Sequence, residues 1–234
     1  MTLRLVAADS CGALTQDAAL AYEASRPWVT VSVEVFDNGL AADALRGNEA
    51  DLGLLSWGSV GEDREQELWT ESFGRDGVAV IVNPASSFSS ADLAQLQEIF
   101  RGRLQEWDGV VLTVVSREDG SGTRAAFESR VLDGDETTLN AVLVVSSRAM
   151  VEYVAETPTA IGYVSTAYLE DRVRALPVNG VAPTDEAIAD GSYPIWRELH
   201  VATNGDPEGE AREFAQWFLR SGTADLGRTG AWTP

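Results

Sequence analysis

The feature that most constrains the fold of this chain is an apolar segment that turns through a glycine-rich loop into a helix. Residues 110–115 are apolar and mostly β-branched, which predicts a strand. The loop Gly120-Ser121-Gly122 follows, and residues 125–128 open a predicted helix. The first N–H groups of a helix have no internal partner, and its dipole favours negative charge. A strand that turns into a helix in this way therefore predicts an anion site.

The side chains around this loop suit the same chemistry. Ser121 and Thr123 carry hydroxyl donors, and Arg117 carries a forked guanidinium that matches a tetrahedral oxyanion. A simpler interpretation is an ordinary glycine-containing turn in which Ser121 only caps the helix. The residues of this stretch alone leave both interpretations open.

Predicted strands and helices alternate along the rest of the chain, which indicates an α/β sheet with its turns gathered at one edge. The capping box of one helix is assigned to Ser89 and Asp92, and residues 58–74 are predicted to be polar surface structure. The predicted strands cover residues 3–7, 29–35, 51–55, 77–84, 110–115, 142–145, 160–164 and 194–203. The main predicted helices cover residues 14–22, 39–45, 93–100, 146–154 and 208–219.

Charge excludes two classes of partner. The 234 residues carry a net charge of -20, and all 17 cations are Arg. Such acidity argues against binding to nucleic acid or to an anionic membrane. It does not exclude a small anion, because local N–H groups and hydroxyls can hold an oxyanion while the global field is screened.

Several motifs resemble those of a known family. The pattern Arg117-x-Asp119-Gly120-Ser121-Gly122-Thr123, with Phe127 four residues on, resembles the signature of the phosphate-binding proteins that serve ABC-type phosphate uptake. Residues 83–84 with 96–107, residues 157–164 and residues 193–199 are similar to further segments of the same family. The resemblance covers residues 75–234 well and the first 75 residues less well.

The resemblance implies a two-lobed type II periplasmic-binding-protein fold, an α/β architecture with the ligand cleft between lobes joined by two crossover strands. Residues 1–79 and 196–234 would form the first lobe, and residues 80–195 the second. Domain closure would then be a hinge motion about the two crossings.

The resemblance also implies a set of ligand-binding residues. In the second lobe these are Arg117, Ser121, Gly122 and Thr123, with Asp119 orienting Arg117. In the first lobe they are Ser10, Cys11, Gly12, Asn38, Gly39, Ser56 and Trp57.

The first lobe departs from the family pattern. Cys11 stands where Thr is commoner, and Asn38-Gly39 replaces a Ser-rich turn. Many members carry an Asp after the third strand that accepts a proton from bound phosphate, whereas residues 55–57 contain no carboxylate. A carboxylate acceptor would repel sulfate, which has no proton to donate. Asp119 is the obvious substitute in the sequence.

The sequence therefore predicts a monomeric binding protein that performs no chemistry, needs no cofactor or metal, and passes phosphate to an ABC permease. The family's habit places it in the periplasm or outside the cell, with a targeting segment trimmed from this chain. One alternative is a degenerate domain that acts as a sensor or binds another oxyanion, such as sulfate or molybdate. The other is an enzyme that uses Cys11, the only cysteine, at a helix N-terminus. The lone histidine, His200, lies in the predicted return strand and gives a Cys–His pair little support.

Overall fold

The computed structural model describes residues 1–57 and 68–222, and it contains a mixed sheet flanked by helices. The described strands of this sheet follow the order β2-β1-β3-β11-β4-β9-β7-β8, with β10 paired to β4. They are β1 (Thr2–Ala8), β2 (Thr30–Phe36), β3 (Leu52–Trp57), β4 (Trp69–Val82), β7 (Thr113–Arg117), β8 (Val142–Val144), β9 (Ala160–Ser165), β10 (Arg174–Ala175) and β11 (Trp196–Thr203). A separate hairpin joins β5 (Glu106–Trp107) to β6 (Val110–Val111). The α-helices are α1 (Gly12–Ser25), α2 (Asn38–Arg46), α3 (Leu93–Phe100), α4 (Gly122–Val131), α5 (Ser147–Glu156), α6 (Asp185–Ala189) and α7 (Gly209–Trp217).

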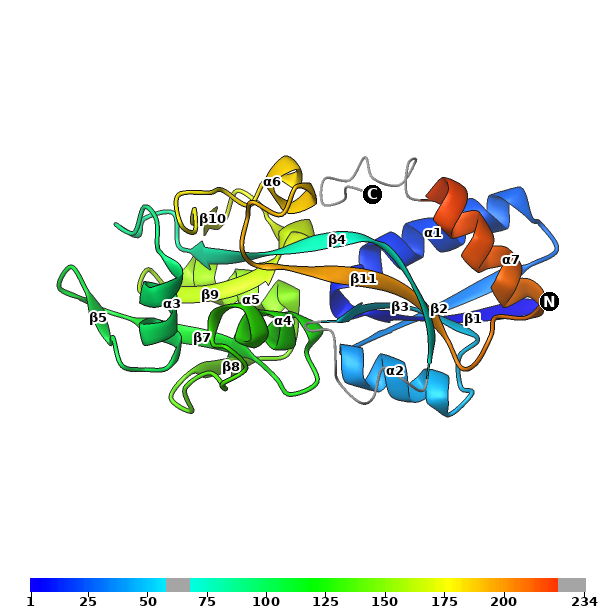
Figure 1. Ribbon diagram of the computed structural model, residues 1–234, viewed down its shortest axis with the longest axis horizontal. Coiled ribbons are helices and arrows are strands. Elements are labelled where there is room, and N and C mark those ends of the chain that lie inside the picture. The colour runs from blue at the N-terminus through cyan, green and yellow to red at the C-terminus, as the bar shows by residue number, and fades with distance from the viewer. Residues whose placement is uncertain (58–67, 223–234) are drawn as a thin grey trace.

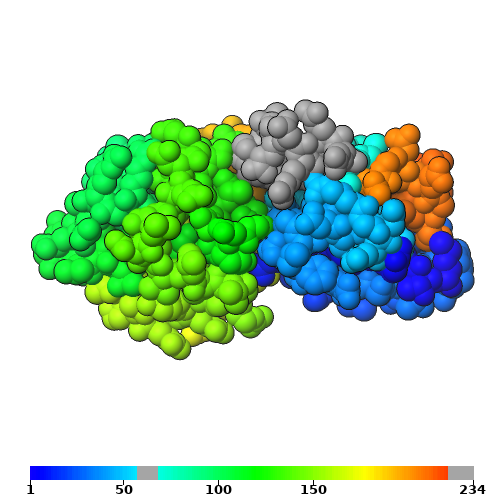
Figure 2. Space-filling model, turned by 90° about the horizontal axis from the view of Figure 1, so that it is seen from below, coloured from blue at the N-terminus to red at the C-terminus, as the bar shows by residue number. Residues whose placement is uncertain are grey.

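These elements form two lobes, which lie side by side (Figures 1 and 2). Lobe I, on the right of Figure 1, contains β1–β3, α1, α2 and α7. Lobe II, on the left, contains α3–α6 and β5–β10. The long strands β4 and β11 run from one lobe to the other. The predicted fold class, a two-lobed α/β protein with two crossover strands, is confirmed.

The partners of β4 change where it passes between the lobes. Its first part pairs with β11, in a register that places Gly77 opposite Trp196. From Val78 to Val82 it pairs with β9 of lobe II instead. The two crossover strands therefore lie against each other on the lobe I side of this change, and β4 enters the core of lobe II beyond it.

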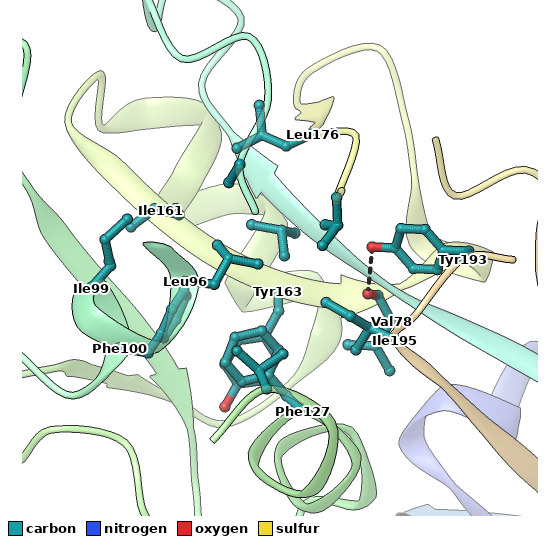
Figure 3. Close-up of a cluster of buried hydrophobic side chains, with 14 of the residues drawn as sticks. Val78, Leu96, Ile99, Phe100, Phe127, Ile161, Tyr163, Leu176, Tyr193 and Ile195 are labelled. Carbon is teal, nitrogen blue, oxygen red and sulfur yellow. Dashed lines mark hydrogen bonds between the residues drawn. The ribbon is translucent and has the colours of Figure 1, made fainter. Parts of the chain in front are cut away.

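Each lobe has its own apolar core. In lobe II, Phe127 stacks on Tyr163 with ring centroids 4.1 Å apart, and Phe100 packs against both rings. Figure 3 shows these rings beneath the aliphatic side chains of β4, β9 and α3. In the same cluster the Tyr193 hydroxyl donates to the carbonyl oxygen of Val78 (3.0 Å). The core of lobe I gathers Leu3, Leu5, Tyr22, Leu54, Phe73, Val201, Phe214 and Phe218.

The segment predicted to be polar surface structure is partly described, and two other local predictions are wrong. Residues 69–74 of that segment form the first part of β4, where Ser72 is exposed and Phe73 is buried. The remainder of that predicted segment, residues 58–67, lies outside the described residues. The capping box of α3 joins Asp92 to Gln95, not Ser89 to Asp92. The segment 110–115 is divided between β6 and β7 instead of forming one strand.

Candidate functional site

The described residues of the two lobes line two cavities between them. The smaller has a volume of about 10 Å³, close to that of one ordered water, and is lined by Ala8, Asp9, Ser10, Asp37, Asn38, Ser56, Arg117, Ser121, Gly122 and Thr123. The outer cavity measures about 270 Å³, and its lining includes Gly39, Arg46, Asp119, Gly120, Arg124, Glu128 and Glu136. Both are bounded by the first turn of α4.

The N-terminus of α4 forms the lobe II wall of the small cavity. Gly120 has a φ of +86°, a conformation that L side chains rarely adopt, and it lets the chain turn sharply from β7 into the helix. The Ser121 hydroxyl then caps the helix by accepting from the Arg124 backbone N–H (3.3 Å). The first N–H groups of α4 therefore face lobe I with the positive end of the helix dipole behind them.

Gly122 is required by the close approach of the two lobes. A Cβ built on it would lie 2.6 Å from the Ser56 Oγ and 2.7 Å from the Ser56 carbonyl oxygen. Real Cβ atoms essentially never come that close to another heavy atom, so a side chain here would push lobe I away from α4. The glycine predicted as a ligand-binding residue thus also sets how tightly the lobes meet.

Arg117 is buried and held by carboxylates from both lobes. Its Nε and Nη2 donate to the two oxygens of Glu118 (2.8 Å each), and its Nη1 donates to Asp9 (3.2 Å) and to Ser147 Oγ (3.1 Å). Burial works to lower the pKa of Arg117, but the bonds and charges of Glu118 and Asp9 outweigh it and raise the pKa. The guanidinium is therefore a fixed, charged wall of the small cavity.

Asp119 does not orient Arg117, so that part of the prediction is wrong. Its carboxylate accepts from Arg124 Nη1 (2.5 Å), and its side chain is 96% exposed. The side chain of Glu118, the neighbouring residue, holds Arg117 instead. Of the two cavities that the described residues line, Asp119 borders the outer one and not the small one. It is therefore badly placed to accept a proton from an ion beside Arg117.

Asp9 is a site residue that the sequence reasoning missed. Its Oδ2 accepts from the backbone N–H (2.9 Å) and the hydroxyl (2.5 Å) of Ser147, at the start of α5, as well as from Arg117. Its carbonyl oxygen accepts from the Tyr168 hydroxyl (2.8 Å). These bonds join the carboxyl end of β1 in lobe I to three segments of lobe II. The available signal was its place directly after a predicted strand, at the edge where the other site turns gather.

The lobe I turns that were predicted to donate to an anion already have partners in the protein. The Ser56 N–H donates to Asn38 Oδ1 (2.8 Å), and the Ser10 hydroxyl donates to Ser56 Oγ (3.3 Å). The Gly39 N–H donates to the Gly120 carbonyl oxygen across the cleft (3.1 Å). Ser10, Asn38 and Ser56 line the small cavity, whereas Gly39 lines the outer one.

Cys11 and Gly12 lie behind the cavity rather than on its wall, as far as the described lining residues show. Cys11 is the N-cap of α1 and is buried, and burial raises the pKa of its thiol to about 12. A thiol with that pKa is a poor nucleophile near neutral pH. Trp57 ends β3 opposite Glu198, and its side chain is outside the described part of the structure.

Asp37 is the second carboxylate of the small cavity. It is the N-cap of α2, where its Oδ1 accepts from the Leu40 N–H (2.9 Å). The same oxygen would lie 2.8 Å from a Cβ on Gly120, so Asp37 reaches the loop that precedes α4. Asp37 is not among the residues that the sequence predicts for the cleft.

The fold and the cavities define a two-lobed α/β protein with a cleft between its lobes. A family model described as the PBP superfamily domain matches residues 2–221, so this chain belongs to the PBP superfamily. It is similar to the phosphate-binding protein PstS of Bacillus subtilis (strain 168), with 37% identity over 148 residues, which cover 61% of this chain and 49% of the relative.

Two solved structures of other proteins are similar to this chain over almost its whole length. A putative phosphate ABC transporter substrate-binding protein with bound phosphate from Clostridium perfringens matches all of both chains, with a TM-score of 0.93 at 24% identity. An ABC-type phosphate transport receptor from Vibrio cholerae matches with a TM-score of 0.82 at 25% identity, over 99% of this chain and 100% of that chain. The resemblance to phosphate-binding proteins that the motifs indicate is thereby confirmed.

Two further findings bound what these likenesses imply. The chain spans about half the length of the curated relatives it matches, 49% of one and 44% of another. Among the helices that the structure describes, none is both long enough and apolar enough to pass through a bilayer.

Proposed function

We propose that this chain is an extracytoplasmic binding protein that captures phosphate between its lobes and delivers it to an ABC-type uptake system. The observation that carries the proposal is the small cavity, where the N-terminus of α4, the Ser121 and Thr123 residues and the buried Arg117 meet. Helix N–H groups, hydroxyls and a guanidinium are the donors that a tetrahedral oxyanion accepts from. The likeness to the phosphate-binding protein of Bacillus subtilis and to the phosphate transport proteins of Clostridium perfringens and Vibrio cholerae supports this choice of ligand.

The carboxylates of the small cavity favour phosphate over sulfate. Phosphate near neutral pH keeps a proton that it can donate, whereas sulfate has none and would place its charge against Asp9 and Asp37. Repulsion of the wrong ligand by an acceptor is a common source of specificity. Asp9 and Asp37 thus take the role for which the sequence offered only Asp119.

The proposed lobe boundaries are residues 1–79 and 196–234 for lobe I and 80–195 for lobe II. The exchange of partners along β4 after Gly77, opposite Trp196, supports both boundaries. Capture would then be a rotation of the lobes about β4 and β11. Because the cavity has room for about one water, the lobes must part to admit an oxyanion and then close on it.

The proposal is tested by isothermal titration calorimetry at neutral pH with protein stripped of anions, first with phosphate and then with sulfate. Micromolar or tighter binding of phosphate, with much weaker sulfate binding, is the expected result. Comparable binding of both anions would show a less selective oxyanion receptor. Binding of neither would contradict the proposed function while leaving the fold untouched.

A further inference from the structure

A buried ion pair lies on the two crossover strands, next to the site but outside the residues discussed so far. Arg197 on β11 donates to Asp76 on β4 through Nε (2.9 Å) and Nη2 (2.6 Å). The two residues stand directly opposite each other in the antiparallel register, and their side chains are 0% and 3% exposed. The remaining oxygen of Asp76 accepts from Ser165 (2.8 Å) and Thr166 (3.3 Å) in lobe II.

The same guanidinium reaches the anion site. Arg197 Nη1 donates to the Thr123 hydroxyl oxygen (3.0 Å), and Thr123 lies in the first turn of α4 on the wall of the small cavity. Asp76 therefore fixes Nε and Nη2 of Arg197, while Nη1 holds Thr123, a residue of the cleft.

The direction of this bond matters for binding. A guanidinium has only donors, so the Thr123 oxygen must accept from Arg197. A hydroxyl has a single hydrogen, and that hydrogen is then left to be donated elsewhere, with the cavity beside it. The contact thus fixes Thr123 as a hydrogen-bond donor toward whatever anion lies in the cavity.

Stability alone gives no reason to keep such a pair. Two charges removed from water lose so much solvation that an apolar pair of similar size is often as stable or more so. The bond to Thr123 supplies a reason, because an apolar pair could not orient a hydroxyl.

We infer that Arg197 is a positioning residue for anion binding, which acts through Thr123 and is itself oriented by Asp76. This inference rests on the proposed function, since it assigns a role in the same site. It predicts that the contribution of the Thr123 hydroxyl to phosphate affinity depends on Arg197.

The test compares Thr123→Ser, which keeps a hydroxyl, with Thr123→Val, which removes it. With Arg197 in place, the Ser variant should bind phosphate at least about tenfold more tightly than the Val variant, since a hydrogen bond to a charged ligand is lost. The comparison is repeated in an Asp76→Asn, Arg197→Met background, which removes both charges and leaves no buried carboxylate unpaired. There the Ser and Val variants should differ less than about threefold, because nothing orients the hydroxyl.

Controls separate positioning from general damage. Arg103→Met with Glu98→Gln removes an ion pair of lobe II away from both cavities, and it should leave the Ser-to-Val ratio at its original value. If the Asp76–Arg197 replacement does not fold, Arg197→Lys serves instead, since an ammonium can keep Asp76 but lacks the fork that also reaches Thr123. Thermal melts without anion show which variants are folded.

An unchanged Ser-to-Val ratio in the background lacking Arg197, with native protein that binds phosphate, would overturn this inference and leave the proposed function standing. Native protein that binds neither phosphate nor sulfate would overturn both. Collapse of the ratio only where Arg197 is altered is the result that supports a positioning role.

Discussion

The two sides of the cleft use their polar groups differently. Lobe II offers donors: the open N-terminus of α4, the residues Ser121 and Thr123, and the buried Arg117. In lobe I, the Ser10 hydroxyl, the Ser56 N–H and the Gly39 N–H already donate within the protein, and two carboxylates of this lobe line the same cavity. Under the proposed function, lobe II would attract the anion, and lobe I would close on it and discriminate between its protonation states.

This division explains how a chain with a net charge of -20 can present an anion site. The attraction is local, and Glu118 and Asp9 already balance the charge of Arg117. Affinity then depends on oriented hydrogen bonds more than on net positive potential. If the division is right, variants of the two lobes should fail in different ways.

Gly122→Ala should have the largest effect, because the added Cβ would press on the Ser56 backbone and keep the lobes apart. If the closed form falls below one in a hundred molecules, phosphate affinity drops about a hundredfold or more. Calorimetry measures the affinity, and small-angle X-ray scattering measures the separation of the lobes. The matched control is Gly47→Ala, whose Cβ meets only ordinary contacts from 3.4 Å. Equal affinities of the two variants would show that this close approach is not needed.

Arg117→Ala should have the second largest effect, because it removes a cationic donor of lobe II and so weakens the attraction of the anion. Loss of one charge-assisted contact costs about 1.5–3 kcal/mol, or roughly ten- to a hundredfold in phosphate affinity. Arg103→Ala, which removes an exposed ion pair of the same lobe, is the control and should bind as the native protein does. Unchanged affinity in Arg117→Ala, measured by calorimetry, would remove Arg117 from the site.

Asp37→Asn should change selectivity rather than attraction. Asn is as good an N-cap as Asp, so α2 should remain stable while the cavity loses a negative charge. Sulfate affinity should rise about tenfold, since repulsion of this size is worth about 1.4 kcal/mol, and phosphate affinity should not rise with it. Competition titrations with both anions measure the ratio. A constant ratio would assign selectivity to Asp9 alone or to another feature.

Tyr168→Phe should have the smallest effect, because it removes one neutral hydrogen bond between the lobes, to the Asp9 carbonyl oxygen. A bond of this kind contributes about 1 kcal/mol, so phosphate affinity should fall roughly fivefold. The phosphate-to-sulfate ratio should stay constant, because the Asp9 carboxylate is untouched. A change in that ratio would contradict the separation of closure from selectivity.

Local chemistry made the lobe II side predictable. The strand, the Gly120 turn and the Ser121 cap lie within a few residues of one another, so their geometry follows from the sequence. The Asp92–Gln95 capping box is equally local, and it was missed because Ser89 offered a competing pattern. The alternating strands and helices predicted an α/β sheet for the same reason, whereas the two lobes were implied by the family resemblance.

The lobe I side of the site could not be predicted from neighbouring residues in the sequence. Asp9 owes its role to Ser147, 138 residues further along the chain, and the contact exists only once the lobes are placed together. In lobe II, the Asp119 prediction failed because Glu118 and Asp119 could each pair with Arg117 or Arg124, and only side-chain geometry decides which of them pair. The role of Cys11 depended on burial, which a single turn motif does not reveal.

The tightness of the cavity also has a consequence for hydration. The small cavity has room for about one water, so an ion that enters it must lose its water shell as the lobes part and close again. Each N–H or hydroxyl of the first turn of α4 must take the place of a water that the ion gives up as the lobes close. An ion bound there would carry no water shell. Its affinity would then depend on how strongly the donors of the cleft stabilise its charge compared with water.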